Sequence, residues 1–364
     1  MSLVIGIDAR AAAEVPAGRG RYVRELLRAL AQLPEAEEVR FELWARERWP
    51  EATLDERFAW RLVGLPDPAW HLAVALRAGG EAFLSTNSYL TAWATRVPTV
   101  VVVYDLVAFV PGGAAAAQQR AARIERATIS PALRRARALA CISQATRDEL
   151  EARFPRARGK SHTIPLAAAS PPHPPVALDP ALGLGERPFV LAVGTLEPRK
   201  NLERLIAAWT RLPARLRAEH TLALVGPRGW QDDAILTAAH EHGARLLGRV
   251  DDAQLQALYA GCAAFAYPSL HEGFGLPVLE AMAAGAPVLT SAASSLPEVA
   301  GDAALLIDPR DTAAIATGLQ RLLTEPGLAD GLRAKGRQRA RAFSWERTAR
   351  ETLGLLTAQA STRA

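Results

Sequence analysis

The sequence predicts an α/β protein built from two Rossmann-like domains, each with a parallel sheet. Short apolar runs alternate with amphipathic segments along the whole 364-residue chain, and this alternation is typical of consecutive βα units. It is interrupted once, between positions 168 and 188, where six prolines fall. The length also suits two domains of ordinary size.

In the first half, apolar runs and helical periodicity follow one another as in a Rossmann-like domain. Pro131 is expected to interrupt or end the first section of one helix, and Ser143 to cap the next. Strands are predicted at residues 3–8, 39–44, 82–85, 99–104, 138–142 and 161–165, and helices at 21–32, 115–137 and 144–154.

The alternation restarts after the prolines. Strands are predicted at residues 189–193, 221–225, 244–247, 263–267, 287–290 and 304–307, and helices at 202–212, 234–241, 253–261, 277–284, from 312, from 328, and at 345–357. The chain is thereby divided into a first domain (1–170), a linker (171–188), a second domain (189–343) and a C-terminal helix (344–364), which is expected to cross back and pack on the first domain. Two such sheets facing across a cleft would place the ligand site in that cleft.

The net charge of +5 is concentrated in the first half. Residues 111–160 hold 11 basic and 4 acidic side chains, so this stretch could meet phosphates or anionic lipid, or could simply be a solvated basic helix. No nucleic-acid recognition module is visible. The two cysteines argue against a disulfide framework. With no basic leader at the N-terminus and no apolar run of about 20 residues, a cytoplasmic protein is expected.

The most informative segment is residues 271–282, HEGFGLPVLEAM. It follows a predicted strand and precedes a helix expected to begin at Pro277. Gly273 and Gly275 let the backbone approach a ligand, so that the amides of residues 273–276 can face an anion at the start of this helix.

The same segment carries two carboxylates, Glu272 and Glu280. On the ligand side of the loop and helix, their oxygens could accept hydrogen bonds from sugar and ribose hydroxyls. The alternative is a tight Gly/Pro loop with incidental glutamates.

Two further loops open helices. Residues 193–202, VGTLEPRKNL, follow a predicted strand, and Arg199 and Lys200 there could neutralise a diphosphate. Gly18 and Gly20 precede the first helix but lack the third glycine of a dinucleotide fingerprint. The two glycines predict either a flexible loop whose backbone amides face a ligand or an ordinary start of a helix.

No metal site is expected. The sequence has no HExxH, CxxC or Asp-x-Asp, and therefore none of the spacings that usually hold a zinc ion or a cation on a diphosphate. Asp251 and Asp252 are interpreted as the cap and first turn of a helix.

These motifs resemble the retaining family 4 glycosyltransferases of GT-B architecture, in particular the bacterial mannosyltransferase-like branch. The resemblance rests on residues 194–201, 247–259 and 267–309, which include the E-x7-E of Glu272 and Glu280. It implies a cytoplasmic, metal-independent hexosyltransferase without a cofactor. The donor would be a nucleoside-diphosphate sugar, with GDP-mannose the best guess, and the acceptor a glycan or lipid-linked molecule in cell-surface polysaccharide synthesis.

The resemblance also implies residue roles in donor binding. Glu272 would lie near the transferred sugar, and Glu280 would bind the ribose. Lys200, with help from Arg199, would hold the diphosphate. The other expected donor-binding residues are Gly18, Gly20, Thr195, Val250, Gly273, Phe274, Gly275 and Leu276.

Two positions depart from the family pattern. Thr195 stands where the family often has Arg, and Tyr104-Asp105 stands where it usually has a His-Asp pair. Tyr104 and Asp105 are therefore candidate catalytic residues, and the tyrosine hydroxyl is expected to contact the donor sugar or the acceptor. The alternative for Tyr104 is a packed aromatic at the end of a strand.

Two other functions remain open from the sequence. The chain could be a nucleotide-sugar epimerase or hydrolase on the same fold, or a non-catalytic nucleotide-sugar-binding subunit. The resemblance also allows peripheral contact with the inner face of the plasma membrane through residues 111–160.

Overall fold

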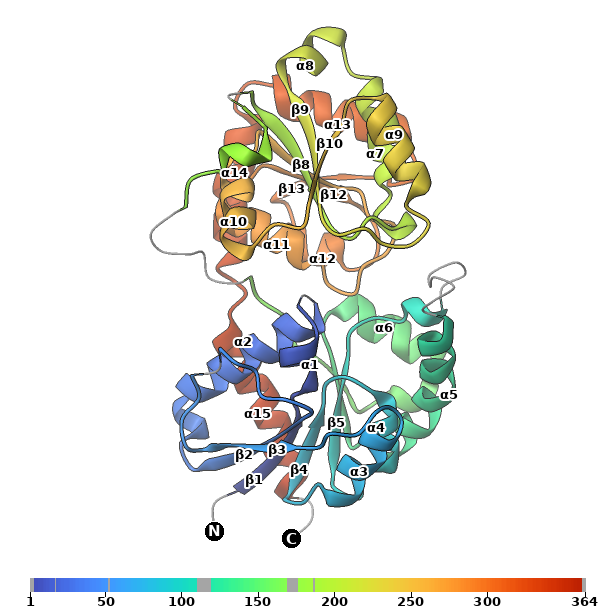
Figure 1. Cartoon of the computed structure of the whole chain (residues 1–364), viewed down its shortest axis with the longest axis vertical. Coiled ribbons are helices and arrows are strands. Elements are labelled where there is room, and N and C mark those ends of the chain that lie inside the picture. Colours follow the sequence, from blue (N-terminus) through green and yellow to red (C-terminus); the bar gives the residue numbers. More distant parts are fainter. Residues whose placement is uncertain are drawn as a thin grey trace. The chain divides into compact units, whose positions relative to one another are not determined.

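The computed structural model describes residues 3–16, 18–51, 53–109, 119–168, 176–185 and 187–361, with only the backbone of residues 119–121. The chain divides into two units, one formed by residues 1–166 together with 344–364 and the other by residues 167–343 (Figure 1). The boundaries expected at 170 and 344 lie close to these divisions. Part of the expected linker, residues 171–175 and 186, lies outside the described residues.

The first unit contains a seven-stranded sheet in which every pairing is parallel, in the order β3-β2-β1-β4-β5-β6-β7. Its strands are β1 (Leu3–Asp8), β2 (Val39–Ala45), β3 (Phe58–Leu62), β4 (Ala82–Ser85), β5 (Thr99–Val103), β6 (Ala138–Cys141) and β7 (Ser161–Thr163). Its helices are α1 (Arg10–Glu14), α2 (Arg19–Gln32), α3 (Ala69–Arg77), α4 (Tyr89–Ala94), α5 (Gln119–Arg135), α6 (Gln144–Arg153) and α15 (Trp345–Ser361).

Helices cover both faces of this sheet. The β-branched strand β5 is buried throughout, and its side chains alternate between the two faces. Val101 and Val103 pack with α5 residues such as Ile129 and Leu133. The other face is covered by α15, which packs on α2 and on β4, β5 and β6.

The second unit contains a six-stranded parallel sheet in the order β10-β9-β8-β11-β12-β13. Its strands are β8 (Phe189–Val193), β9 (Thr221–Val225), β10 (Arg245–Gly248), β11 (Ala264–Tyr267), β12 (Val288–Ser291) and β13 (Ala304–Ile307). Its helices are α7 (Leu202–Thr210), α8 (Ala214–Glu219), α9 (Asp233–Glu241), α10 (Asp252–Gly261), α11 (Leu276–Ala284), α12 (Leu296–Ala300), α13 (Thr312–Thr324) and α14 (Leu328–Ala340).

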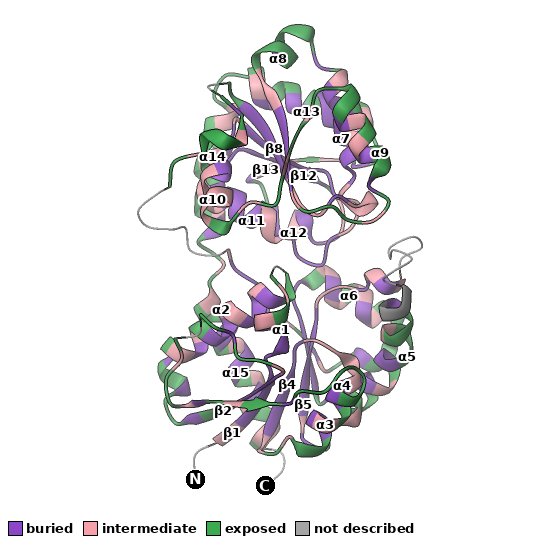
Figure 2. Ribbon diagram, viewed as in Figure 1, coloured by how far each residue is buried: buried purple, intermediate pink, exposed green. Residues whose placement is uncertain are grey.

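Burial follows position in each sheet. The central strands β8 and β11 are buried along nearly their whole length, whereas the edge strand β10 is largely exposed (Figure 2). A core of Val190, Leu205, Leu224, Leu289 and other apolar side chains fills the second unit. This core holds the ends of the central strands, and the loops that follow them, in fixed positions.

Most predicted helix starts and ends are confirmed within a few residues. Ser143 and Asp251 cap the helices expected of them, and Ser344 caps α15; each accepts a hydrogen bond from a first-turn amide. Gly285 ends α11 with φ of 83°, as expected of a left-handed C-cap.

Two predictions about prolines are wrong. Helix α5 continues through Pro131 to Arg135. A proline inside a helix costs about 3 kcal/mol, but Ile129, Ala132 and Leu133 around it are buried in the core, and their packing offsets that cost. In α11, Pro277 occupies the second helical position rather than the first, because the helix begins at Leu276.

Candidate functional site

The candidate site of the second unit lies at the point in its sheet where the strand order reverses, between β8 and β11. β8 is flanked by β9 and β11, so the loops after β8 and β11 leave the sheet side by side and in the same direction. Ligands of open α/β sheets bind at such a switch point, beyond the carboxyl ends of the strands. The loops that carry the predicted donor residues are these two.

The loop after β8 is shaped by a short 3₁₀ turn at Pro198–Lys200. Asn201 then adopts φ of 60° and begins α7. Its buried side-chain amide donates to the carbonyl oxygens of Pro268, at 2.9 Å, and Pro309, at 2.7 Å. Asn201 thereby ties the two loops together, a role that its position in the sequence did not suggest.

The loop after β11 needs a glycine at its last position. Gly275 has φ of 108°, in the left-handed region, and an added Cβ would come within 2.7 Å of Leu296 Cδ2. Two serines after β12 fix the same loop. Ser294 Oγ accepts from the Glu272 amide at 2.9 Å, and Ser295 Oγ donates to the Glu272 and Phe274 carbonyls at 2.9 and 2.8 Å.

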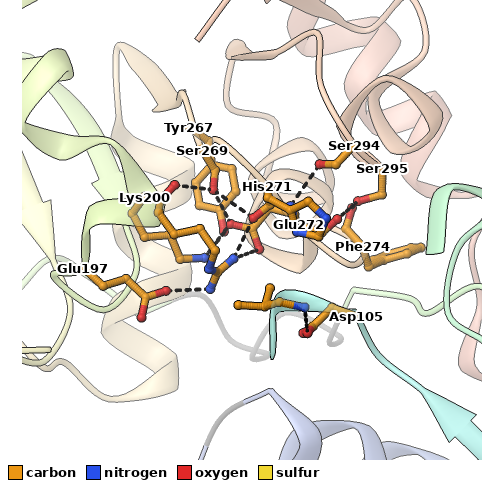
Figure 3. A network of polar contacts seen from close by, with 12 residues as sticks. Asp105, Glu197, Lys200, Tyr267, Ser269, His271, Glu272, Phe274, Ser294 and Ser295 are labelled. Carbon is orange, nitrogen blue, oxygen red and sulfur yellow. Dashed lines mark hydrogen bonds and ion pairs between the residues drawn. The ribbon is translucent and has the colours of Figure 1, made fainter. Parts of the chain in front are cut away.

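Lys200 and Glu272 form the centre of a buried polar network (Figure 3). The ammonium of Lys200 lies 2.6 Å from Glu272 Oε1 and donates to the Tyr267 hydroxyl at 2.6 Å. Glu272 Oε1 also accepts from the hydroxyls of Tyr267, at 2.9 Å, and Ser269, at 2.6 Å. The sequence analysis had not singled out Tyr267 and Ser269 as members of the site.

Arg199 completes the network from the other side. Its guanidinium lies 2.8 Å from Glu272 Oε2 and 2.6 Å from Glu197 Oε1, and it donates to the His271 carbonyl at 2.8 Å. Two cations, Lys200 and Arg199, therefore face two carboxylates, Glu272 and Glu197. The network as it stands is neutral.

The carboxyl of Glu272 is ionised in this network. Burial alone would raise its pKa, but the charges of Lys200 and Arg199 and the hydrogen bonds of Lys200 and Ser269 outweigh burial and hold the pKa well below its ordinary value. Because Glu272 is only 9% exposed, this charge is stabilised by its neighbours rather than by water.

The first turn of α11 offers backbone donors beside the network. Among the residues that the structure describes, no acceptor is recorded for the amides of Phe274, Gly275 and Leu276. The Phe274 ring itself is buried against Phe343, with ring centres 5.8 Å apart. The segment therefore presents its backbone, at a helix N-terminus where an anion is favoured.

Glu280 lies deeper in the same unit, on α11. Its side chain is 2% exposed, and its Oε2 accepts from the Tyr259 hydroxyl at 3.2 Å. Thr195 follows β8, and Val250 lies in the short segment between β10 and α10. The structure thus places Lys200, Arg199 and Glu272 in one network, with Glu280 on the helix that follows.

A cavity of 710 Å³ lies in the first unit, among residues at and beyond the carboxyl ends of β4 and β5. Its lining includes cations, carboxylates, hydroxyls, one amide and two tyrosines, together with the apolar residues Pro68, Leu90, Val101, Val102 and Ile124. Arg10, Arg19, Asp67, His71, Ser85, Thr86, Asn87, Ser88, Tyr89, Tyr104, Asp105, Glu125 and Thr128 are its polar lining residues.

Tyr104 and Asp105 both line this cavity. The Tyr104 ring packs edge-on against Tyr22, with centres 5.5 Å apart, and its buried hydroxyl has no hydrogen-bond partner among the described residues. Asp105 accepts from the Val107 amide at 2.9 Å. Tyr104 is therefore packed, as the alternative expected, while it also borders the cavity.

Gly18 and Gly20 begin α2 in the first unit, and α2 starts two residues earlier than predicted. Gly18 is the helix N-cap, with φ of 56°. Gly20 is buried in the first turn, and a Cβ there would lie 1.7 Å from the Val15 carbonyl oxygen. Close packing of the preceding segment thus requires Gly20, whatever ligand the loop meets.

Neither a metal site nor a membrane-spanning helix is found among the described residues. Over the described ranges, no group of three or more His, Cys, Asp or Glu side chains could hold a metal ion. None of the described helices combines the length and apolar character that crossing a membrane requires.

Residues 178–341 match the family model of the glycosyl transferases group 1. This range carries both loops of the candidate site. Residues 178–341 are a glycosyl transferases group 1 domain. The O-antigen chain mannosyltransferase B of Escherichia coli is 38% identical over 227 residues, which is 60% of this chain and 60% of that protein. The chain thus spans less than two thirds of the length of the curated relatives that it matches, 60% of this one and 20% of the serotype-specific mannosyltransferase WbdA of Escherichia coli.

Solved structures extend the likeness beyond the glycosyl transferases group 1 domain. The sucrose-phosphate synthase of Thermosynechococcus elongatus superposes with a TM-score of 0.76 at 23% identity, over all of both chains. Anabaena HepE in complex with UDP and glucose gives 0.74 at 17% identity, over 98% of this chain and all of that one. The expected GT-B fold, two Rossmann-like units with parallel sheets, is therefore confirmed.

Proposed function

We propose that this chain is a retaining, metal-independent glycosyltransferase. It moves a hexose from a nucleoside-diphosphate sugar, with GDP-mannose as the first candidate, to a glycan or lipid-linked acceptor in cell-surface polysaccharide synthesis. The names of the relatives support this choice, since the one at 38% identity is an O-antigen mannosyltransferase. HepE, which shares the fold, is described in complex with UDP and glucose.

The observation that carries the proposal is the start of α11. Three consecutive amides, of Phe274, Gly275 and Leu276, have no recorded acceptor in the described part of the chain. They adjoin a network with two partly buried cations, Lys200 and Arg199. Amides at a helix N-terminus together with cations suit a diphosphate.

Both cations are paired with Glu272 before the donor binds. Donor binding must therefore displace this carboxylate from Lys200 and Arg199. As the diphosphate arrives, its oxygens compete with the Glu272 carboxylate for Lys200 and Arg199. The carboxylate then has free lone pairs and accepts hydrogen bonds from hydroxyls of the donor sugar. Glu272 thus holds the cations in place before the donor binds and contacts the sugar afterwards, while Glu280 binds the ribose.

In the reaction, the acceptor hydroxyl oxygen attacks the anomeric carbon from the face that the diphosphate leaves. The carbon–oxygen bond to the diphosphate breaks as the new one forms, and the acceptor's proton passes to the departing phosphate oxygen. No protein nucleophile is needed. Lys200, Arg199 and the α11 amides stabilise the charge that develops on the diphosphate, and positioning supplies the rest.

The acceptor is assigned to the cavity of the first unit, beside Tyr104 and Asp105. Its lining combines two cations with three carboxylates, Asp67, Asp105 and Glu125, together with hydroxyls and an amide. This mixture suits the hydroxyls of a sugar better than an anionic group. We therefore place an uncharged sugar of the glycan in this cavity and any phosphate or lipid outside it.

The cellular setting is part of the proposal. The enzyme acts in the cytoplasm, with peripheral contact between residues 111–160 and the inner face of the plasma membrane. Residues 111–118 of this basic stretch and the side chain of Arg120 lie outside the described residues.

The test is an assay of the purified full chain with GDP-mannose, UDP-glucose and other nucleotide sugars, with and without mannosyl acceptors. Transfer with the donor's anomeric configuration in the product, read by NMR, supports the proposal. Release of free sugar or an isomer without an acceptor favours a hydrolase or epimerase. Binding of a nucleotide sugar without turnover on any acceptor favours a binding subunit.

A further inference from the structure

A second pocket in the first unit lies at the opposite edge of its sheet, where β5, β6 and β7 begin. It has a volume of 520 Å³ and is lined by segments 95–99 and 134–137 and by Lys160. We call it the amino-edge pocket. The acceptor cavity borders Tyr104 and Asp105, which follow the last residue of β5. No residue lines both the pocket and that cavity, so the two are distinct.

The amino-edge pocket is strongly cationic. Five of its lining side chains, Arg96, Arg134, Arg135, Arg137 and Lys160, are basic, and none of its lining residues is acidic. Over the described ranges, no ion pair is recorded for any of the five. Lys200 and Arg199 of the other unit, in contrast, are both paired with carboxylates.

Two of these cations are held in place by backbone carbonyls. Lys160 donates to the carbonyl oxygens of Leu133 and of Ala136, the latter at 2.9 Å, and Arg135 donates to the Thr95 carbonyl at 2.9 Å. Carbonyl oxygens orient a cation without cancelling its charge. Partial burial lowers the pKa of Lys160, with no carboxylate opposing the shift, so a bound anion would stabilise its charged form.

We propose that the amino-edge pocket binds a phosphate-bearing anion. Guanidinium groups recognise phosphate through paired, parallel hydrogen bonds, and the pocket offers four of them around one hollow. Its volume is within the range of small-molecule sites and exceeds what one phosphate fills. The ligand is therefore a diphosphate or the phosphorylated headgroup of a larger molecule. This inference does not depend on the proposed function, since the pocket is outside the transfer site.

The test uses a charge reversal on two exposed arginines whose side chains make no described hydrogen bond, Arg96→Glu with Arg137→Glu. The matched control, Arg40→Glu with Arg341→Glu, changes the net charge equally at exposed arginines elsewhere. Pyrophosphate is the soluble probe. Hydrogen exchange is followed in peptides covering residues 95–99 and 134–137, which report on this pocket alone.

Pyrophosphate should slow exchange in these peptides in the wild type and in the control. In the pocket variant, its affinity there should fall at least tenfold, since a charged hydrogen bond is worth about that factor or more. Protection confined to residues 268–276, or equal protection in the pocket and control variants, would overturn the proposal. Because the reversal removes repulsion among like charges, the pocket variant should also melt no lower than the control.

Co-sedimentation with vesicles distinguishes the two sources of phosphate. If the wild type binds vesicles of phosphatidylglycerol with phosphatidylcholine tenfold or more tightly than the pocket variant, the ligand is a membrane headgroup. If pyrophosphate binds the pocket variant more weakly than the wild type but the vesicles bind both equally, the ligand is a free phosphorylated molecule. Both results support the site. If neither probe discriminates them, there is no phosphate site at this edge.

Discussion

Lys200 and Glu272 form an ion pair of 2.6 Å in which the two side chains are only 11% and 10% exposed. They come from loops after different strands of the sheet. Arg199 contacts the second oxygen of the same carboxylate. One carboxylate thus contacts both cations assigned to the diphosphate, and the site's stability and its chemistry depend on the same atoms.

We expect Glu272→Gln to destabilise the protein by about 3–5 kcal/mol, because Lys200 loses its counter-charge and Arg199 keeps only that of Glu197. The pKa of Glu272 in the fold lies below its ordinary value of 4.5. Its contribution is therefore fully present above about pH 4.5 and is lost as the pH falls below that value. Urea unfolding at pH 7 and pH 4 measures both effects.

Glu325→Gln is the control for this substitution, because it removes an exposed carboxylate that pairs with Arg321. Its unfolding curve should match the wild type. Equal stability of Glu272→Gln and Glu325→Gln at pH 7 would contradict the role given to the buried pair.

Glu125 gives the opposite pH dependence. Burial, followed by the charge of Asp105, raises its pKa to about 7 from an ordinary 4.5. The folded protein then binds more protons than the unfolded one between these values, so this contribution to stability is present below pH 4.5 and is lost as the pH rises through 7. Glu125→Gln should remove up to about 3 kcal/mol of this pH dependence. If the unfolding free energy of Glu125→Gln depends on pH between 4.5 and 8 as that of the wild type does, the raised pKa of Glu125 is contradicted.

Glu280→Gln should raise the KM for the nucleotide-sugar donor by about tenfold or more, because a charged hydrogen bond to the ribose becomes a neutral one. Tyr259→Phe is the matched control, since it removes the hydroxyl that donates to Glu280 and keeps the carboxylate. If both variants change only the melting temperature, Glu280 has a structural role.

Tyr104→Phe separates packing from substrate contact. The buried hydroxyl has no partner among the described residues, so its removal should not lower the melting temperature. If the hydroxyl bonds a sugar during turnover, kcat/KM should fall by about two- to tenfold, as for the loss of one neutral hydrogen bond. Parental kinetics would leave Tyr104 a purely packing residue.

Activity should survive exhaustive dialysis against EDTA. In the proposed mechanism the charge on the leaving diphosphate is met by Lys200, Arg199 and the α11 amides, which perform the task a divalent cation performs elsewhere. The assay compares initial rates before and after chelation. Loss of activity that magnesium or manganese restores would refute this account.

The strands could largely be predicted because a buried parallel strand is a run of apolar residues in the sequence itself. The strand β3 was missed because it lies at the sheet edge, where only Phe58 is buried. The nine-residue helix α3 was missed too, and so were the short helices α1, α4, α8 and α12, of five or six residues. Segments of that length carry too few turns for a periodic pattern.

The loops of the candidate site could be located, but the contacts within them could not. Nothing in the sequence pairs Lys200 with a glutamate 72 positions away, or Asn201 with the carbonyl of Pro309. Lys200 meets Glu272 because β8 and β11 are neighbours in the sheet, whereas Pro309 follows β13, which lies three strands away from β8. The acceptor cavity could not be predicted from the sequence either, because its lining comes from segments scattered over the first unit.

Helix α15 has a consequence for biosynthesis. It belongs to the first unit, and its residues Leu353 and Leu356 are buried there, with Trp345 against Tyr22. Domains generally fold as units while the ribosome is still adding residues. When residue 343 has been added, the second unit has all of its residues, but the first unit still lacks the helix that covers one face of its sheet. The order in which the units can finish folding is thus the reverse of the order in which they begin in the sequence.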